Sequence, residues 1–138
     1  MEEPGLALGI DIGGTNTAFG IVDHKGTILF EGVTSTKSHE RPESLADFIF
    51  DTLGEHSFRE QLIGIGIGAP NGNHFTGNIE FAPNLHWKGI VPMAKIFMEK
   101  FNKKTIMTND ANAAAVGEML FGAAIGLKNF VTITLGTG

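Results

Sequence analysis

Residues 9–17 read Gly-Ile-Asp-Ile-Gly-Gly-Thr-Asn-Thr and join the end of an apolar run to a glycine pair and polar side chains. Apolar residues on both sides of the glycines predict two strands connected by a tight turn. Glycine permits a sharp bend and a close ligand, and turn N–H and threonine hydroxyl groups suit phosphate oxygens. Asp11, just before the turn, would hold Mg²⁺ through water, because Mg²⁺ prefers oxygen ligands. An ordinary hairpin with a buried acid is the alternative interpretation of the same residues.

The composition favours one packed domain, or one domain with a piece of another. Of the 138 residues 42% are hydrophobic, which is enough for a core, and the net charge of −5 without a basic block argues against nucleic acid as a partner. The chain has no cysteine, so no disulfide or thiolate zinc site is expected within it, and the cytoplasm is the expected location. The acidic N-terminus is not typical of a signal peptide, and no apolar run reaches membrane-helix length, so no membrane partner is expected.

Hydrophobic periodicity predicts an α/β protein that begins with an antiparallel meander of three short strands. Alternate glycines after Leu62 leave one face of the fourth strand bare, so a helix, another backbone or a ligand can approach it closely. A turn and a looser stretch follow over residues 69–87. The expected strands span residues 6–12, 17–22, 27–34, 62–67, 105–108 and 130–135, and the expected helices span 42–54, 92–101 and 113–122.

Asn109 and Asp110 stand between an expected strand and an expected helix, which is a usual place for a site in an α/β fold. Asp110 has two interpretations, which are compatible. It could cap the helix N-terminus with its side-chain acceptor. It could also accept the proton of a substrate hydroxyl while Asn109 binds the neighbouring hydroxyl. Aspartate is ionised at neutral pH and orients an alcohol well, which suffices for phosphoryl transfer.

Three further stretches carry weaker signals. Residues 134–138, Thr-Leu-Gly-Thr-Gly, repeat the pattern of the opening turn and predict either a second phosphate loop or a plain glycine turn. Residues 64–69 match GxGxxA after a strand, but Pro70 and Asn71 follow in place of a helix, which argues against a dinucleotide site. Trp87 is interpreted as a partly buried loop anchor, and the amide of Asn84 suits sugar hydroxyls.

Taken together, these motifs resemble the ROK family (repressor, open reading frame, kinase), and most of all its glucokinase-type sugar kinases. The resemblance runs from about residue 6 to residue 138, and the order and spacing of the motifs make it specific. The motifs are Asp-Ile-Gly-Gly-Thr at 11–15, Gly-Ala-Pro at 68–70, Asn-Leu-His-Trp at 84–87, Asn-Asp-Ala-Asn-Ala-Ala-Ala-Val-Gly-Glu at 109–118 and Thr-Leu-Gly-Thr-Gly at 134–138.

The resemblance implies an actin-like, RNase H-like ATPase fold, in which parallel strands extend the meander and helices cover both faces. Residues 1–115 would form the N-terminal domain, and 116–138 the crossover helix and first strand of a truncated second domain. ATP and Mg²⁺ would be the cofactors and a hexose the substrate, with glucose phosphorylated at its 6-hydroxyl. Asp110 would be the catalytic base.

The resemblance also implies which residues would bind the two substrates. The sugar ligands would be Asn109, Gly68, Asn71 and Asn84. The ATP phosphates would be held by Asp11, Gly13, Gly14, Thr15, Asn16, Thr134, Gly136, Thr137 and Gly138.

The sequence departs from the family in lacking its second domain, which supplies further sugar-binding Glu and His residues, a cysteine-rich zinc site and most of the dimer contact. We therefore expect zinc only outside these residues, a homodimer for the full-length protein, and little or no activity from the 138 residues alone. The alternative function is a sugar-responsive repressor of the same family. Such repressors carry a helix-turn-helix ahead of the Asp-Gly-Gly motif, whereas ten residues precede Asp11 here.

Overall fold

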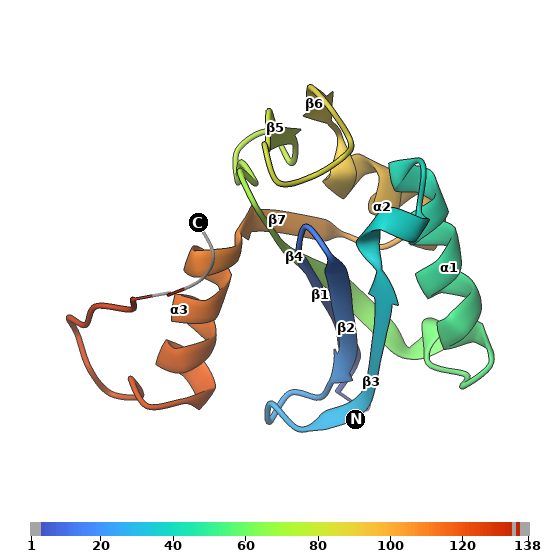
Figure 1. Cartoon of the computed structure of the whole chain (residues 1–138). Helices are drawn as coiled ribbons and strands as arrows, with labels where there is room; N and C mark the ends of the chain where they lie inside the picture. The colour runs from blue at the N-terminus through green and yellow to red at the C-terminus, as the bar shows by residue number, and fades with distance from the viewer. Residues whose placement is uncertain (1–3, 134, 136–138) are drawn as a thin grey trace.

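The computed structural model describes residues 4–133 and 135. It consists of a five-stranded sheet, a separate two-stranded sheet and three α-helices (Figure 1). The strands are β1 (Leu6–Ile12), β2 (Asn16–Val22), β3 (Ile28–Ser35), β4 (Leu62–Ala69), β5 (Ile79–Glu80), β6 (Ile90–Val91) and β7 (Thr105–Asn109). The helices are α1 (Pro42–Gly54), α2 (Met93–Phe101) and α3 (Asp110–Phe121), with short 3₁₀ segments η1 (Thr36–Ser38) and η2 (Arg59–Gln61).

The large sheet has the strand order β3-β2-β1-β4-β7. Strands β1, β2 and β3 form the predicted antiparallel meander, and β4 and β7 extend it in parallel from β1. The β2–β3 turn is closed by Asp23, whose carboxylate accepts the N–H groups of Lys25 and Thr27 at 2.9 Å each. Such local bonds are the reason that aspartate favours turns.

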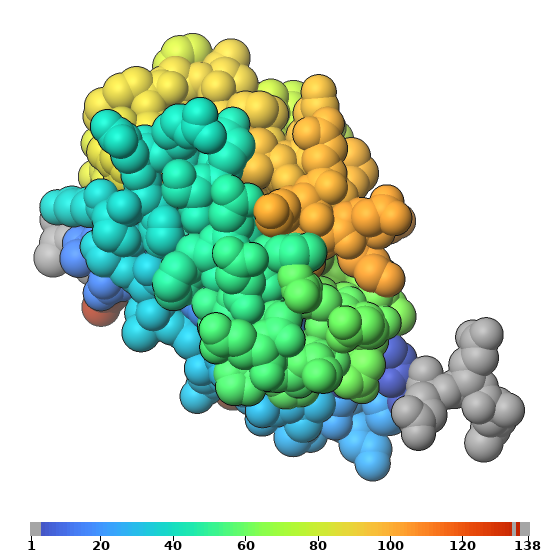
Figure 2. All heavy atoms as spheres, turned by 90° about the vertical axis from the view of Figure 1, so that its right-hand side faces the viewer, coloured from blue at the N-terminus to red at the C-terminus, as the bar shows by residue number. Residues whose placement is uncertain are grey.

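One face of the sheet is covered by α1 and α2, which lie side by side over it (Figure 2). Alternate residues of β1 point to this face, and Leu8 and Ile12 are fully buried there. Leu45, Ile49 and Leu53 of α1 are also fully buried, as the spacing of one helix face requires. Each fully buried side chain of this size contributes about 1.5–3 kcal/mol. This layer is the core of the molecule.

The opposite face of the sheet is lined by small side chains. Gly20, Gly9 and Gly66 are neighbours in one row across β2, β1 and β4. A Cβ atom built at Gly9 or Gly66 would have no neighbour within 4 Å, so packing within the described chain does not require glycine there. A hollow of about 1370 Å³ lies over this face.

Helix α3 lies on this second face, where it contacts β4 and β7. A Cβ atom added to Gly68 would come within 3.1 Å of the Ala113 Cβ, so the bare face of β4 permits the close helix that alternate glycines predicted. Helices are therefore present on both faces of the sheet, as expected. On the second face α3 contacts mainly β4 and β7, and Phe121 at its end approaches Gly26 in the β2–β3 turn. None of the side chains of α3 is buried.

Three expectations about the elements were wrong. The loose stretch at 74–87 contains β5, which pairs with β6 in a small antiparallel sheet. Helix α3 begins at Asp110 rather than residue 113. The expected strand at 130–135 is absent from the described residues 130–133 and 135, where Val131 and Ile133 are exposed, because no described strand pairs with it.

The predicted division into residues 1–115 and 116–138 stays a prediction, and α3 runs without a break across it. Within the described residues, no helix is both long and apolar enough to span a bilayer.

Candidate functional site

The candidate site lies where β1, β4 and β7 reach the same edge of the sheet. Asp11 of β1 is paired with Gly68 of β4, and Gly68 is paired with Thr108 of β7. Asn109 ends β7, and Asp110 opens α3. The topology therefore brings together Asp11, Gly68, Asn109 and Asp110, which come from three separate parts of the sequence. The carboxyl edge of parallel strands is where ligands bind in open α/β sheets.

Asp11 points away from the core. Its alternation with buried Ile10 and Ile12 places its side chain on the open face. Partial burial raises the pKa of Asp11 above the usual value of 3.8, and the negative charge of Asp110 raises this pKa further. Asp11 is paired with Gly68, and a Cβ atom on Gly68 would lie 3.5 Å from the Asp110 Cα. The two carboxylates therefore belong to one corner of the sheet, where a bound cation would relieve their repulsion.

Asp110 does not cap α3, contrary to one of the two interpretations of its role. The cap is Asn109, whose Oδ1 accepts the backbone N–H of Asn112 at 2.7 Å. Among the residues that the structure describes, the Asp110 Oδ1 accepts one hydrogen bond, from the N–H of Ala111 at 3.0 Å, and the residue is exposed. The carboxylate is thus left available for a substrate hydroxyl.

The turn after β1 is shaped by close approach rather than by unusual backbone angles. Neither Gly13 nor Gly14 has a positive φ. A Cβ atom at Gly13 would lie 2.8 Å from the carbonyl oxygen of Asn16, and one at Gly14 would lie 2.6 Å from the carbonyl oxygen of Asn84. Larger residues would collide with backbone at both positions, so glycine is needed there because it has no Cβ atom and not because of its φ angle.

The same turn offers donors to a ligand. Gly13 donates its N–H to the carbonyl of Asn16 at 2.9 Å. Within the described residues, the N–H groups of Gly14 and Thr15 donate to no protein acceptor. Thr15 and Asn16 are exposed. The turn therefore presents backbone N–H groups together with a hydroxyl, as a phosphate-binding turn does.

The other predicted sugar ligands are placed differently from one another. Asn84 is exposed and lies against the turn through its contact with Gly14. Asn71 has a left-handed backbone with φ 54°, and its amide nitrogen donates to the carbonyls of Glu80 and Phe81 at 3.0 and 3.2 Å. Both Asn71 donors are thus used to hold the loop, which leaves only its Oδ1 for a ligand.

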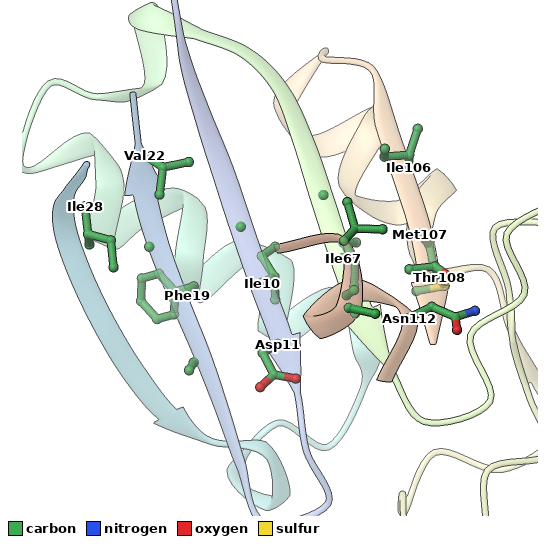
Figure 3. A pocket seen from close by; sticks show the side chains of 18 of the residues that line it. Ile10, Asp11, Phe19, Val22, Ile28, Ile67, Ile106, Met107, Thr108 and Asn112 are labelled. Carbon is green, nitrogen blue, oxygen red and sulfur yellow. The ribbon is translucent and has the colours of Figure 1, made fainter. Parts of the chain in front are cut away.

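Two residues at this edge were missed by the sequence analysis. Thr108 of β7 and Asn112 of α3 line the hollow, and Figure 3 shows them at the same end of it as Asp11. The sequence pattern indicates both residues. Thr108 follows Met107 in a strand and so lies on the other face of the sheet, and Asn112 stands about one helical turn after Asn109 and so lies on the same side of the helix. The predicted phosphate residues Thr134, Gly136, Thr137 and Gly138 lie outside the described residues.

The donor set at this edge fits Mg²⁺. Two carboxylates, Asp11 and Asp110, are near each other, and Mg²⁺ is usually bound by one or two carboxylates together with substrate phosphates and water. No group of three or more His, Cys, Asp or Glu side chains suited to a metal occurs in the described part of the chain. A protein-only metal cage is therefore not what these residues provide.

Comparison with known proteins places the chain in a class and then in a family. The model of the ROK family matches residues 7–138. A ROK family glucokinase from Streptomyces griseus, solved in complex with glucose and AMPPNP, is 35% identical and superimposes with a TM-score of 0.71 over 88% of this chain and 38% of that one. The protein thus has the actin-like ATPase fold. It belongs to the ROK family.

Relatives with two kinds of function are similar to this chain. A glucokinase from Streptomyces coelicolor is 37% identical over 97% of the chain, which corresponds to 42% of the glucokinase. A xylose repressor from Caldicellulosiruptor bescii is 31% identical over 99% of the chain and 36% of the repressor. The chain therefore spans less than half the length of the curated relatives that it matches.

Proposed function

We propose that these residues are the part of an ATP-dependent hexose kinase that carries the catalytic base and one of its phosphate-binding turns. The observation that carries the proposal is the meeting of Asp11, Asp110 and the Gly13–Asn16 turn at one edge of the sheet. Glucose, phosphorylated at its 6-hydroxyl, is the substrate we favour, because glucokinases are found both among the similar sequences and among the similar solved structures.

In this proposal Asp110 accepts the proton of the sugar hydroxyl as the oxygen attacks the terminal phosphate. Asn109 orients the neighbouring hydroxyl, and its side-chain bond to Asn112 keeps the two residues at the start of α3. Gly68 would line the sugar pocket at the place where α3 packs closely against β4. Asn84 and the Oδ1 of Asn71 would bind the sugar. Positioning and charge neutralisation provide most of the catalysis in phosphoryl transfer, so a weak base suffices.

The phosphate end of the site would use the turn after β1. The N–H groups of Gly14 and Thr15 would donate to phosphate oxygens, with Gly13 and Asn16 shaping the turn. Asp11 would hold Mg²⁺ through water, and the metal when bound would offset charge on the phosphates. Thr134, Gly136, Thr137 and Gly138 are proposed as the opposing phosphate loop.

Replacing Asp110 by Asn in the full-length protein tests the proposed base. The change keeps the size of the side chain but removes the proton acceptor, so we expect kcat to fall by about 10²–10⁴-fold while the sugar KM changes little. A coupled ADP-release assay measures this. Asp51→Asn is the control and should keep full turnover, because Asp51 is an exposed residue of α1, on the face of the sheet opposite α3. Unchanged kcat in a folded Asp110→Asn variant would remove Asp110 from this role.

The second candidate is a sugar-responsive repressor, and the similarity to xylose repressors favours it. The net charge of −5 and the exposed Asp110 carboxylate argue for the kinase. Turnover across a panel of hexoses, set against binding of operator-length DNA by the full-length protein, separates the two. The same family likeness leads us to propose a cytoplasmic homodimer whose structural zinc lies outside these residues.

A further inference from the structure

Trp87 ties the loop that carries Asn84 to the segment after β3. It is the only tryptophan of the sequence and is 5% exposed although it lies in a loop. Its Nε1 donates to the carbonyl oxygen of His39 at 2.9 Å, in a buried hydrogen bond. The same carbonyl accepts the Nε2–H of His86 at 2.7 Å. One backbone oxygen therefore holds two adjacent side chains of the Asn84 loop.

The segment Thr36–His39, which we call the bracket, holds the phosphate turn at its other end. The backbone N–H of Thr36 donates to the carbonyl of Thr15 at 2.8 Å. The hydroxyls of Thr36 and Thr17 share a 2.7 Å hydrogen bond, and both residues are fully buried. Hydroxyls with no exposure need a partner, so this bond fixes the bracket to the start of β2.

The bracket is also fixed to the strand before it. The His39 ring is buried beside Phe48, and its Nε2 lies 2.9 Å from the Thr34 hydroxyl. Burial lowers the pKa of His39, and the charge of His86 lowers this pKa further, so the His39 ring is neutral at the pH of a kinase assay.

The phosphate turn and the Asn84 loop also contact each other directly. Gly14 packs so tightly against the Asn84 carbonyl that a Cβ atom would lie 2.6 Å from that oxygen. The phosphate turn therefore touches the Asn84 loop directly and is also joined to it through the bracket. Packed side chains and hydrogen bonds that run without a break between two sites are the kind of network through which binding at the two sites can be coupled, and a coupling measurement tests it.

We propose that the bracket couples the two substrate sites, with Trp87 as a positioning residue that holds Asn84 at a set distance from the Gly13–Asn16 turn. This proposal rests on the proposed function, since it assigns Asn84 to the sugar and the turn to phosphate. Sugar binding would order the Asn84 loop and, through the bracket, the turn. By linkage, each ligand then raises the affinity for the other by the same factor.

Trp87→Phe in the full-length protein is the test. Phenylalanine keeps an aromatic ring in the pocket but cannot donate to the His39 carbonyl. We expect the sugar Kd to rise about tenfold and the factor by which sugar tightens binding of the ATP analogue AMPPNP to fall toward one. Calorimetric titrations of glucose and AMPPNP, each alone and in the presence of the other, measure both. Hydrogen exchange at the Thr36 amide should also become faster, because its acceptor Thr15 is less well held.

Phe50→Leu is the matched control. It weakens the partly buried α1–α2 contact with Phe101, where the ring centroids are 5.1 Å apart, and the ring contacts of Phe50 among the described residues involve neither the bracket nor the loop. It should lower stability while both ligand affinities and their coupling stay unchanged. If Trp87→Phe behaves like Phe50→Leu, the bracket is only structural and the inference is overturned while the kinase stands. If the wild-type protein binds and phosphorylates no hexose, the proposed function itself is overturned.

Discussion

At the scale of single residues, the charge of Asp11 is unfavourable for the stability of the folded chain. Its carboxylate is disfavoured in the folded state, first by partial burial and then by the charge of Asp110. A charge that is disfavoured in the folded protein costs stability wherever the group is ionised. Sites that bind a cation commonly carry such a cost, because the ligand offsets it.

This balance predicts a pH-dependent effect of Asp11→Asn. The pKa of Asp11 is raised on folding, so the folded state holds this proton more tightly and the free energy of unfolding falls as pH rises above about 4. At pH 7 the cost is fully present, and Asp11→Asn should be more stable than the wild type. Below about pH 3 the wild-type Asp11 is protonated and neutral, as the asparagine of the variant is at any pH. The difference in stability between the two proteins should therefore vanish. Urea unfolding at pH 3 and pH 7 measures this.

Asp23→Asn is the control of opposite sign. The pKa of Asp23 is lowered mainly by the hydrogen bond from the backbone N–H of Thr27, and the backbone N–H of Lys25 lowers it further. This variant should therefore be less stable than the wild type at pH 7 and should approach it as pH falls. A destabilised Asp11→Asn at neutral pH would contradict the electrostatic account of the site.

Two glycines make a second pair at this scale. Gly14→Ala places a methyl group 2.6 Å from the Asn84 carbonyl, which is backbone and cannot easily move, whereas Gly9→Ala meets nothing within 4 Å. We expect Gly14→Ala to lose about 1–3 kcal/mol and Gly9→Ala to be neutral or to gain up to about 1 kcal/mol. Denaturant unfolding of both variants measures the difference, and equal stabilities would show that the close contact is absent in solution.

At the scale of elements, the sequence predicted the strands of the large sheet well because their apolar residues alternate. β1 has the predicted bounds, β2 begins one residue earlier than predicted, and β3 begins and ends one residue later than predicted. The predicted start of α3 was wrong because Asn109 caps the helix, one residue before Asp110, so the helix begins at Asp110. β5 and β6 were missed since each has two residues and depends on bonds from elsewhere, such as those of Asn71.

The start of α3 offers a test that separates capping from sugar binding. Asn109→Asp keeps the acceptor for the Asn112 N–H but loses the amide donor, so α3 should stay intact while sugar affinity falls. Asn109→Ala loses both and should also cost about 1 kcal/mol of stability. Thermal unfolding and glucose titration of the full-length variants measure the two effects. Sugar affinity unchanged in Asn109→Asp would exclude its amide as a ligand.

At the scale of the whole molecule, helices cover one face of the large sheet, and much of the other face is exposed. α1 and α2 complete the core, while the hollow over Gly20, Gly9 and Gly66 has α3 at one side only. Apolar side chains of α3 and the residues after it, among them Leu120, Phe121 and Val131, are exposed. The site at the sheet edge is correspondingly open to water.

This openness predicts that the 138-residue chain alone has little or no kinase activity. Phosphoryl transfer needs groups on both sides of the phosphates and exclusion of water, and the chain spans 42% of the length of a glucokinase relative. A coupled ADP-release assay with glucose, run beside the full-length protein, measures it. Turnover comparable to that of the full-length protein would show that these residues are sufficient.

The sequence by itself determined the meander, the buried faces of α1 and α2 and the family, because periodicity and motif order are local properties of the chain. It also pointed to Asp11 and Asp110. Only the tertiary structure decided that these two carboxylates repel each other, that Asn109 rather than Asp110 caps α3, and that the donors of Asn71 are already used. Only the tertiary structure placed Gly14 against Asn84. Asp11 and Asp110 are 99 residues apart and Gly14 and Asn84 are 70 apart, so strand pairing and packing bring them together rather than any local pattern. The bonds of Asn109 and Asn71 span only three to ten residues, but their partners are set by where the helix begins and how the loop folds back.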